Sequence, residues 1–187
     1  MAIVLDGTAN TVTPLNGALG GTTPNTVAAT TVVASSTIKG ATTIAVGNAT
    51  PSASGAGITF PATQSASSNA NTLDDYEEGT WTPNQGSGIT ITGSFNSSGT
   101  YTKIGNLVYV TARQQAGTVT VASATGELCT NLPFSVLSSG PANSWGNISN
   151  VAGTVAGVVN AAVSSVFNNG TAIPSTASIY WSFTYTT

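Results

Sequence analysis

The stretch that decides the fold is YTKIGNLVYVTAR, residues 101–113. Two runs rich in Tyr, Thr, Ile, Leu and Val stand on either side of Gly105-Asn106, a dipeptide suited to a two-residue turn. Residues of these types favour extended backbone. The stretch therefore predicts a β-hairpin with strands at 101–104 and 107–113.

Similar short strands are predicted on both sides of this hairpin. In the segments 89–92 and 179–185 apolar and polar residues alternate with a period of two, which is the pattern of β-strands, because successive side chains of a strand point to opposite faces. The further candidates are 119–121, a strand from Glu127, 151–159 and 161–167; the β-branched and glycine content of the last two argues against a helix. Roughly seven to nine short strands separated by Gly, Asn and Ser turns predict an all-β fold, a β-sandwich of the jelly-roll kind.

The aromatic residues divide the chain in two. Of three Trp, five Tyr and five Phe, only Phe60 precedes residue 73. Because aromatic side chains supply much of the buried area of a compact core, we expect a core from residue 73 onward and none before it. The sequence thus predicts an extended N-terminal attachment arm at residues 1–72 and a β-sandwich domain at residues 73–187.

The predicted arm is rich in Thr, Ala, Gly, Ser and Val, and it contains two similar pieces, 29–33 and 41–46. Its β-branched residues favour strands that become ordered only against copies of the chain or a partner, since flexible linkers are typically Gly- and Ser-rich. A flexible linker is the alternative interpretation.

The composition excludes several classes of function. Charged residues make up 5% of the chain, with three Lys and Arg, six Asp and Glu, and no His, for a net charge of −3. Three cations cannot build a nucleic-acid-binding surface, and no histidine is present for acid–base catalysis or metal binding. The single cysteine, Cys129, permits no internal disulfide, and we expect it to be a small buried hydrophobe. No cofactor, secretory signal or membrane-spanning segment is predicted.

Four of the six acids are clustered: Asp74, Asp75, Glu77 and Glu78. We interpret the cluster as a solvated acidic hinge between arm and domain, with Leu73, Tyr76 and Trp81 packed beneath it. Calcium binding through carboxylate oxygens is an alternative, although the cluster lacks the spacing of an EF-hand loop. A glycosidase carboxylate pair is a further alternative, which adjacent acids on one loop fit poorly because the pair must flank the sugar.

Aromatic rings can bind glycans, because flat rings stack on the faces of sugars. Trp145, in a predicted loop, and Tyr180 are the candidate glycan-binding residues, whereas Trp181 is assigned to the core because its segment alternates strongly. Serine catalysis is not expected, since no Gly-x-Ser-x-Gly motif and no histidine base accompany any serine.

One segment carries a family resemblance. Residues 71–83, NTLDDYEEGTWTP, resemble a junction sequence found in tail-fibre-like and other virion surface proteins of tailed bacteriophages. Residues 47–61 are similar to the approach to that junction, residues 99–110 to the hairpin that follows it, and Leu132-Pro133-Phe134 to a further recurring element.

The resemblance implies a non-enzymatic virion protein, usually a homotrimer, that attaches through its N-terminal part and displays a β domain. A short trimeric tail fibre acting in host adsorption is the first hypothesis, a capsid decoration (cement) protein is the alternative, and a glycan-depolymerising tailspike is disfavoured for want of separated carboxylates. The expected partners are copies of the chain, other virion proteins and a host surface glycan. The expected location is the virion surface, on tail or head, with no nucleic acid bound and no membrane insertion.

Overall fold

The computed structural model describes residues 43–121, 126–137, 145–150, 155–162, 165–168 and 172–187. Every regular element among these residues is a β-strand and none is a helix, which confirms the all-β prediction. The described residues belong to one compact unit, Gly40–Thr187. Residues 1–42 of the predicted arm, and parts of the strands predicted at 151–159 and 161–167, lie outside the described residues.

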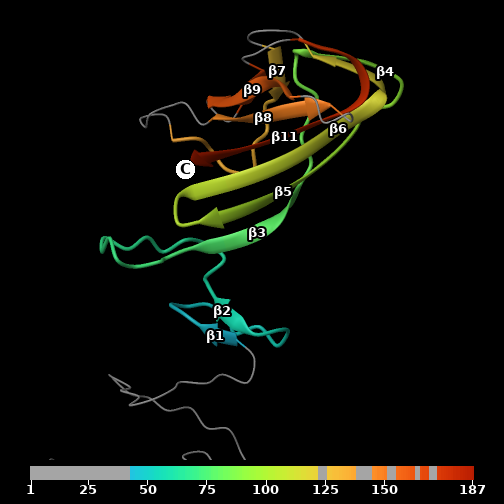
Figure 1. The fold of residues 1–187 in the computed structure, drawn as a ribbon. Coiled ribbons are helices and arrows are strands. Elements are labelled where there is room, and N and C mark those ends of the chain that lie inside the picture. Colours follow the sequence, from blue (N-terminus) through green and yellow to red (C-terminus); the bar gives the residue numbers. More distant parts are fainter. Residues whose placement is uncertain (1–42, 122–125, 138–144, 151–154, 163–164, 169–171) are drawn as a thin grey trace, which may run out of the picture. The chain divides into compact units, whose positions relative to one another are not determined.

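The described residues form the strands β1 (Thr43–Ala45), β2 (Gly57–Thr59), β3 (Tyr76–Trp81), β4 (Ile89–Thr92), β5 (Asn96–Ile104), β6 (Leu107–Val121), β7 (Gly126–Cys129), β8 (Trp145–Asn150), β9 (Val155–Ala162), β10 (Ser165–Asn168) and β11 (Ile173–Thr186). All of them except β10 are labelled in Figure 1. β1 and β2 pair in parallel as a two-stranded sheet of their own. The other nine form one antiparallel sheet in the order β3-β5-β6-β11-β8-β9-β10-β7, with β4 pairing with the C-terminal part of β6.

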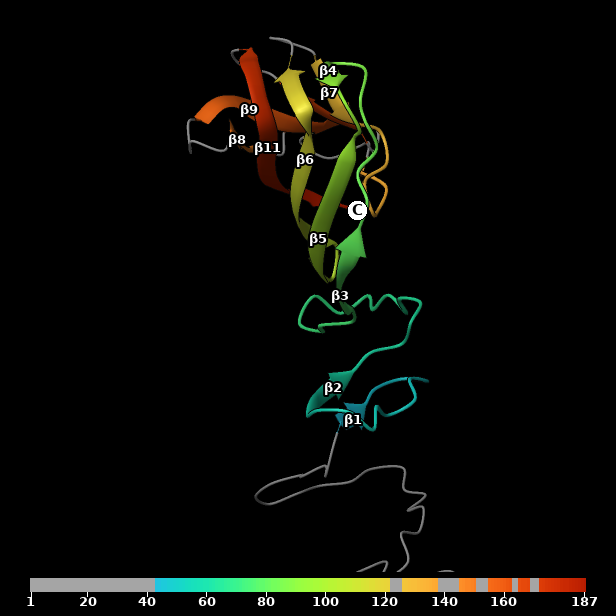
Figure 2. The ribbon, with the colours of Figure 1, turned by 90° about the vertical axis from the view of Figure 1, so that its right-hand side faces the viewer.

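The predicted hairpin is formed by β5 and β6, which lie between β3 and β11 in this sheet. β5 and β6 pair in register from Ile104↔Leu107 to Asn96↔Gln115, and the turn between them is Gly105-Asn106. Gly105 has a φ of 56°, a left-handed conformation that suits glycine. On its other side β6 pairs with β11 along most of its length, so the two longest strands are neighbours, as both views show (Figures 1 and 2).

The large sheet curls back on itself. Between β3 and β4 the chain passes β7, where Gly86 N and Gly88 N donate backbone hydrogen bonds to Leu128 O and Glu127 O, both at 2.9 Å. Both glycines are required by this close approach, because a Cβ on either would collide with the backbone of β7. Backbone hydrogen bonds therefore close a ring of neighbouring segments. From β6 the ring runs through β11, β8, β9, β10 and β7 to residues 86–88, and the next strand, β4, pairs with β6 again.

The core is formed by inward-facing side chains of these strands. Its buried hydrophobic members are Ile89, Val108, Val110, Ala112, Val119, Val121, Leu128, Cys129, Leu132, Ile148, Ile173, Ile179, Trp181, Phe183 and Tyr185. On β11 the rings of Trp181, Phe183 and Tyr185 follow one another with centroids 5.7 and 5.6 Å apart. Each fully buried side chain of this size contributes roughly 1.5–3 kcal/mol. None of residues 43–72 is buried.

Gln114 ties the core together through its amide. The side chain is fully buried on β6, and its Nε2 donates to Asn84 O and to Leu128 O, both at 2.9 Å. Its Oε1 accepts a hydrogen bond from Trp181 Nε1 at 3.0 Å. Both amide N–H groups and the amide oxygen are thus satisfied, as a buried polar group requires. One side chain links β6 to β7, to β11 and to the segment after β3.

Tyr185 fixes the segment that contains the Leu132-Pro133-Phe134 element. Its hydroxyl accepts a hydrogen bond from Phe134 N and donates one to Phe134 O, each at 3.2 Å. Burial raises the pKa of Tyr185 to about 12. The Phe134 ring also makes an edge-to-face contact with Tyr101, with centroids 5.2 Å apart. The phenol is therefore held in its neutral, hydrogen-bonding form.

The predicted acidic hinge is wrong in its local structure. Glu77 and Glu78 lie in β3, which pairs with β5 in continuous register. Leu73 and Tyr76, expected beneath the cluster, are 56% and 40% exposed, and only Trp81 packs against the core. The acids are compatible with a strand because β3 stands at the end of the described sheet, and charged side chains are common on such edges.

Candidate functional site: the outer face of the sheet

Asp75 occupies a different environment from the other acids of the cluster. Its side chain is fully buried and forms an ion pair with Lys103 of β5, which is also buried. Lys103 Nζ further donates to Gln64 Oε1 at 3.3 Å and lies 5.6 Å from the centre of the Phe134 ring. The backbone carbonyl of Asp75 accepts a hydrogen bond from Gly105 N. Asp75 is therefore an internal anchor of the β5–β6 hairpin and not a solvated hinge residue.

The remaining acids point to separate partners. Asp74 accepts hydrogen bonds from Ser67 N at 2.7 Å and Gln64 Nε2 at 3.2 Å, and the bond from Ser67 lowers the pKa of Asp74. Glu78 accepts a hydrogen bond from Tyr76 Oη at 2.9 Å, which raises the pKa of Tyr76. Within the part of the chain that the structure describes, no three acidic or thiol groups converge as metal ligands do. The four acids do not form a common site.

The outer face of the sheet is the side of β3, β5, β6, β11 and β8 that is turned away from the core. Strand register places its side chains in rows across the strands. The central row is Thr80, Thr100, Thr111, Ser182 and Asn147. The row on one side of it is Ser98, Arg113, Tyr180 and Ser149, and the row on the other side is Glu78, Thr102, Tyr109 and Thr184. These three rows thus hold mainly hydroxyl groups, together with two tyrosines, the cation Arg113 and the acid Glu78 on the outermost strand.

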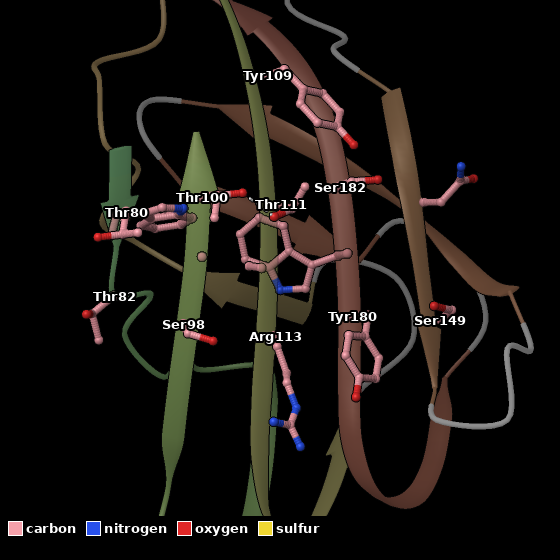
Figure 3. Close-up of a pocket in the computed structure, with 15 residues that line it drawn as sticks. Thr80, Thr82, Ser98, Thr100, Tyr109, Thr111, Arg113, Ser149, Tyr180 and Ser182 are labelled. Carbon is pink, nitrogen blue, oxygen red and sulfur yellow. Dashed lines mark hydrogen bonds between the residues drawn. The ribbon is translucent and has the colours of Figure 1, made fainter. Parts of the chain in front are cut away.

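The outer face is hollowed into an open concavity of about 600 Å³. Figure 3 shows Tyr109 at one end, Arg113 beside Tyr180 at the other, and the threonine and serine hydroxyls between them. Among the described residues that line it, none is an acid. The hydroxyl groups of Thr100 and Thr111 are hydrogen-bonded to each other at 2.8 Å. The lining can therefore exchange hydrogen bonds and stack, but it holds no carboxylate for acid–base chemistry.

Arg113 and Tyr180 form the most distinctive pair on the outer face. The guanidinium carbon lies 5.8 Å from the centre of the Tyr180 ring, and Nη2 donates to Ser178 Oγ at 3.4 Å. Both side chains are exposed. No carboxylate of the described chain lies within ion-pair distance of Arg113, since the described ion pair is Asp75–Lys103. The guanidinium is thus positioned by a ring and a hydroxyl while its charge remains available to a ligand.

The aromatic candidates from the sequence have three different outcomes. Tyr180 lies exposed on the outer face. Trp181 is buried and donates to Gln114, which confirms its assignment to the core. Trp145 is the first residue of β8 and pairs with Asn160 of β9, so the predicted loop is wrong, and the placement of its side chain lies outside what the structure describes. Cys129 is buried in β7, as predicted.

Sequence reasoning missed Tyr109 and Arg113 as members of the site. The signal was present in the hairpin stretch, where Leu107, Tyr109, Thr111 and Arg113 occupy alternate positions and so share one face. Two facts could not be read from the sequence: which face is inward, and that β11 places Tyr180 directly opposite Arg113.

Comparison with known proteins adds no identification. No family model, no characterised protein and no solved structure matches this chain. None of the described segments forms a helix able to cross a membrane. The features of the chain that bear on its function are the geometry of the outer face and the resemblance of the 71–83 segment.

Proposed function

We propose that this chain is a non-enzymatic structural protein on the surface of a tailed-phage virion. In this proposal it is a short trimeric tail fibre that attaches through its N-terminal arm and displays the β domain for host adsorption. The curled sheet serves as a jelly-roll-like sandwich, and the arm becomes ordered against neighbouring chains. The observation that carries the proposal is the unequal burial: residues 43–72 contribute no buried side chain, whereas the core begins at Ile89.

The outer face supports the adsorption part of the proposal. A wide surface that combines hydroxyl groups with aromatic rings is suited to a ligand that has both hydroxyl groups and apolar faces, as sugars do. The lining contains no paired carboxylates among the described residues, which favours binding over glycan cleavage.

Oligomeric state and position on the particle test this proposal. Light scattering of the purified full chain is expected to give three times the chain mass of 18.5 kDa. Labelled antibodies are expected to decorate the tail of the virion in electron micrographs. A monomer at all concentrations, or particles without label, would overturn the proposal.

A capsid decoration protein is the second candidate, because the segment that residues 71–83 resemble is found in other virion surface proteins as well as in tail-fibre-like ones. Antibody label on the head of the particle would select this candidate. Decoration also predicts that particles lacking the protein lose heat resistance while keeping their ability to adsorb.

A further inference from the structure

We propose that the outer face is a binding site for an acidic, uronate-containing oligosaccharide, with Arg113 holding a sugar carboxylate. This inference rests on the proposed role in host adsorption and names the ligand of that role. Three features carry it: the hydroxyl rows, the two exposed tyrosines and the unpaired guanidinium.

The hydroxyl rows indicate a carbohydrate ligand. Hydroxyl groups donate and accept hydrogen bonds, and they match the alternating donors and acceptors of sugar hydroxyls. Serine is depleted in protein–protein interfaces, and Ser and Thr are rare among energetic hot spots, so the hydroxyl rows favour a sugar over a protein; the tyrosines and Arg113 suit either ligand. Nucleic acid is disfavoured, since Arg113 is the one exposed cation of the described chain and the net charge is −3.

The dimensions of the outer face favour an extended chain over a single sugar. Five strands at the usual spacing make the central row roughly 19 Å long. Tyr109 and Tyr180 flank this row on opposite sides, so two rings are available to stack on separate sugar units. The concavity is open at its sides, which allows the ends of an oligosaccharide to continue beyond it.

The charge of Arg113 selects an acidic sugar. A guanidinium binds a carboxylate through two parallel hydrogen bonds, and Arg113 has no carboxylate partner among the described residues. The cation–π contact with the Tyr180 ring and the hydrogen bond to Ser178 limit its motion before any ligand arrives. Pre-organisation of this kind reduces the entropy that binding must overcome.

The direct test is calorimetric titration of the full chain with defined oligomers of galacturonate, mannuronate and glucuronate. Each oligomer is paired with its methyl ester, which keeps the hydroxyls but removes the charge. We expect at least one acid form to bind, and we expect the affinity for its methyl ester to be lower by about tenfold or by a larger factor. Added salt is expected to weaken the acid form selectively, because it screens an exposed charge pair.

Variants locate the site. Arg113→Ala and Tyr180→Ala are each expected to lower affinity about tenfold, while Tyr76→Ala, which removes a ring of nearly equal exposure outside the concavity, leaves it unchanged. Circular dichroism and the unfolding midpoint of all three variants must match the parent. The inference is overturned if no uronate oligomer binds, if acid and ester bind equally, or if Arg113→Ala binds as tightly as the parent. A trimer located on virions that fails these titrations would retain the proposed function and lose only this inference.

Discussion

The two faces of the same strands of the large sheet have opposite chemistry. On β6, Val108, Val110 and Gln114 face the core and are completely buried, while Tyr109 and Arg113 between them are exposed. On β11, Trp181 and Phe183 are buried and Tyr180 is exposed. The comparison teaches that the inner face determines the stability of the domain, whereas the outer face is left available for a ligand. A substitution on one face should therefore have an effect that a matched substitution elsewhere in the chain does not have.

The largest expected effect is the loss of the buried ion pair. Asp75→Asn leaves the Lys103 ammonium buried without a counter-charge, and removing one partner of a buried pair costs about 3–5 kcal/mol of unfolding free energy. Urea unfolding followed by tryptophan fluorescence at pH 7 measures it.

Asp74→Asn is the matched control, because Asp74 is not buried and its neighbouring hydrogen bonds are exposed. We expect this variant to lose less than about 1 kcal/mol. Equal losses for the two variants would contradict the description of Asp75 as an internal anchor.

The next effect is expected from Gln114→Leu. Leucine fills a similar volume but leaves Trp181 Nε1 and Asn84 O without their partner, whereas Leu128 O keeps the hydrogen bond from Gly86 N. Since each unsatisfied buried group costs about 1–3 kcal/mol, the unfolding free energy should fall by about 2 kcal/mol or more. Gln115→Leu, one residue further along β6, should change it by less than about 1 kcal/mol, because no side-chain hydrogen bond of Gln115 occurs among the described residues.

Alkaline pH tests the inner face through Tyr185. Its pKa in the folded state, about 12, is above the ordinary value of 10.0, so its contribution to stability is complete below pH 10 and is lost as the pH rises from 10 through 12. The shift corresponds to roughly 2–3 kcal/mol. Urea midpoints measured between pH 9 and 12 should therefore fall, and Tyr185→Phe should flatten this fall; a variant with the parent's pH profile would show that Tyr185 is not the group responsible.

The smallest effect is expected on the outer face. Thr111→Val keeps the β-branched shape and removes only an exposed hydroxyl bonded to Thr100. The unfolding free energy should change by no more than about 0.5 kcal/mol. A loss as large as that of Gln114→Leu would mean that the hydroxyl rows are part of the folding core.

The sequence predicted the strands well where alternation is regular. The hairpin at 101–113, the strand at 89–92 and the strand at 179–185 are all present, because a two-residue turn determines the hairpin and local alternation determines the other two strands. β3 was missed because the acids of the cluster suggested a solvated surface. The positions of these acids depend on non-local contacts: β3, with Glu77 and Glu78, pairs with β5, and Asp75 pairs with Lys103. The outer face could not be derived in full, because rows across strands depend on non-local register.

The central claim is that Tyr109 and Tyr180 face solvent while Tyr185 is enclosed, and chemical modification tests it most directly. The full chain in its native oligomeric state is treated with tetranitromethane at neutral pH, and the nitrated tyrosines are identified by mass spectrometry. The account predicts rapid nitration of Tyr109 and Tyr180 and none of Tyr185 until the protein unfolds. Protection of Tyr180 in the folded protein, or nitration of Tyr185 at the rate of Tyr180, would contradict it.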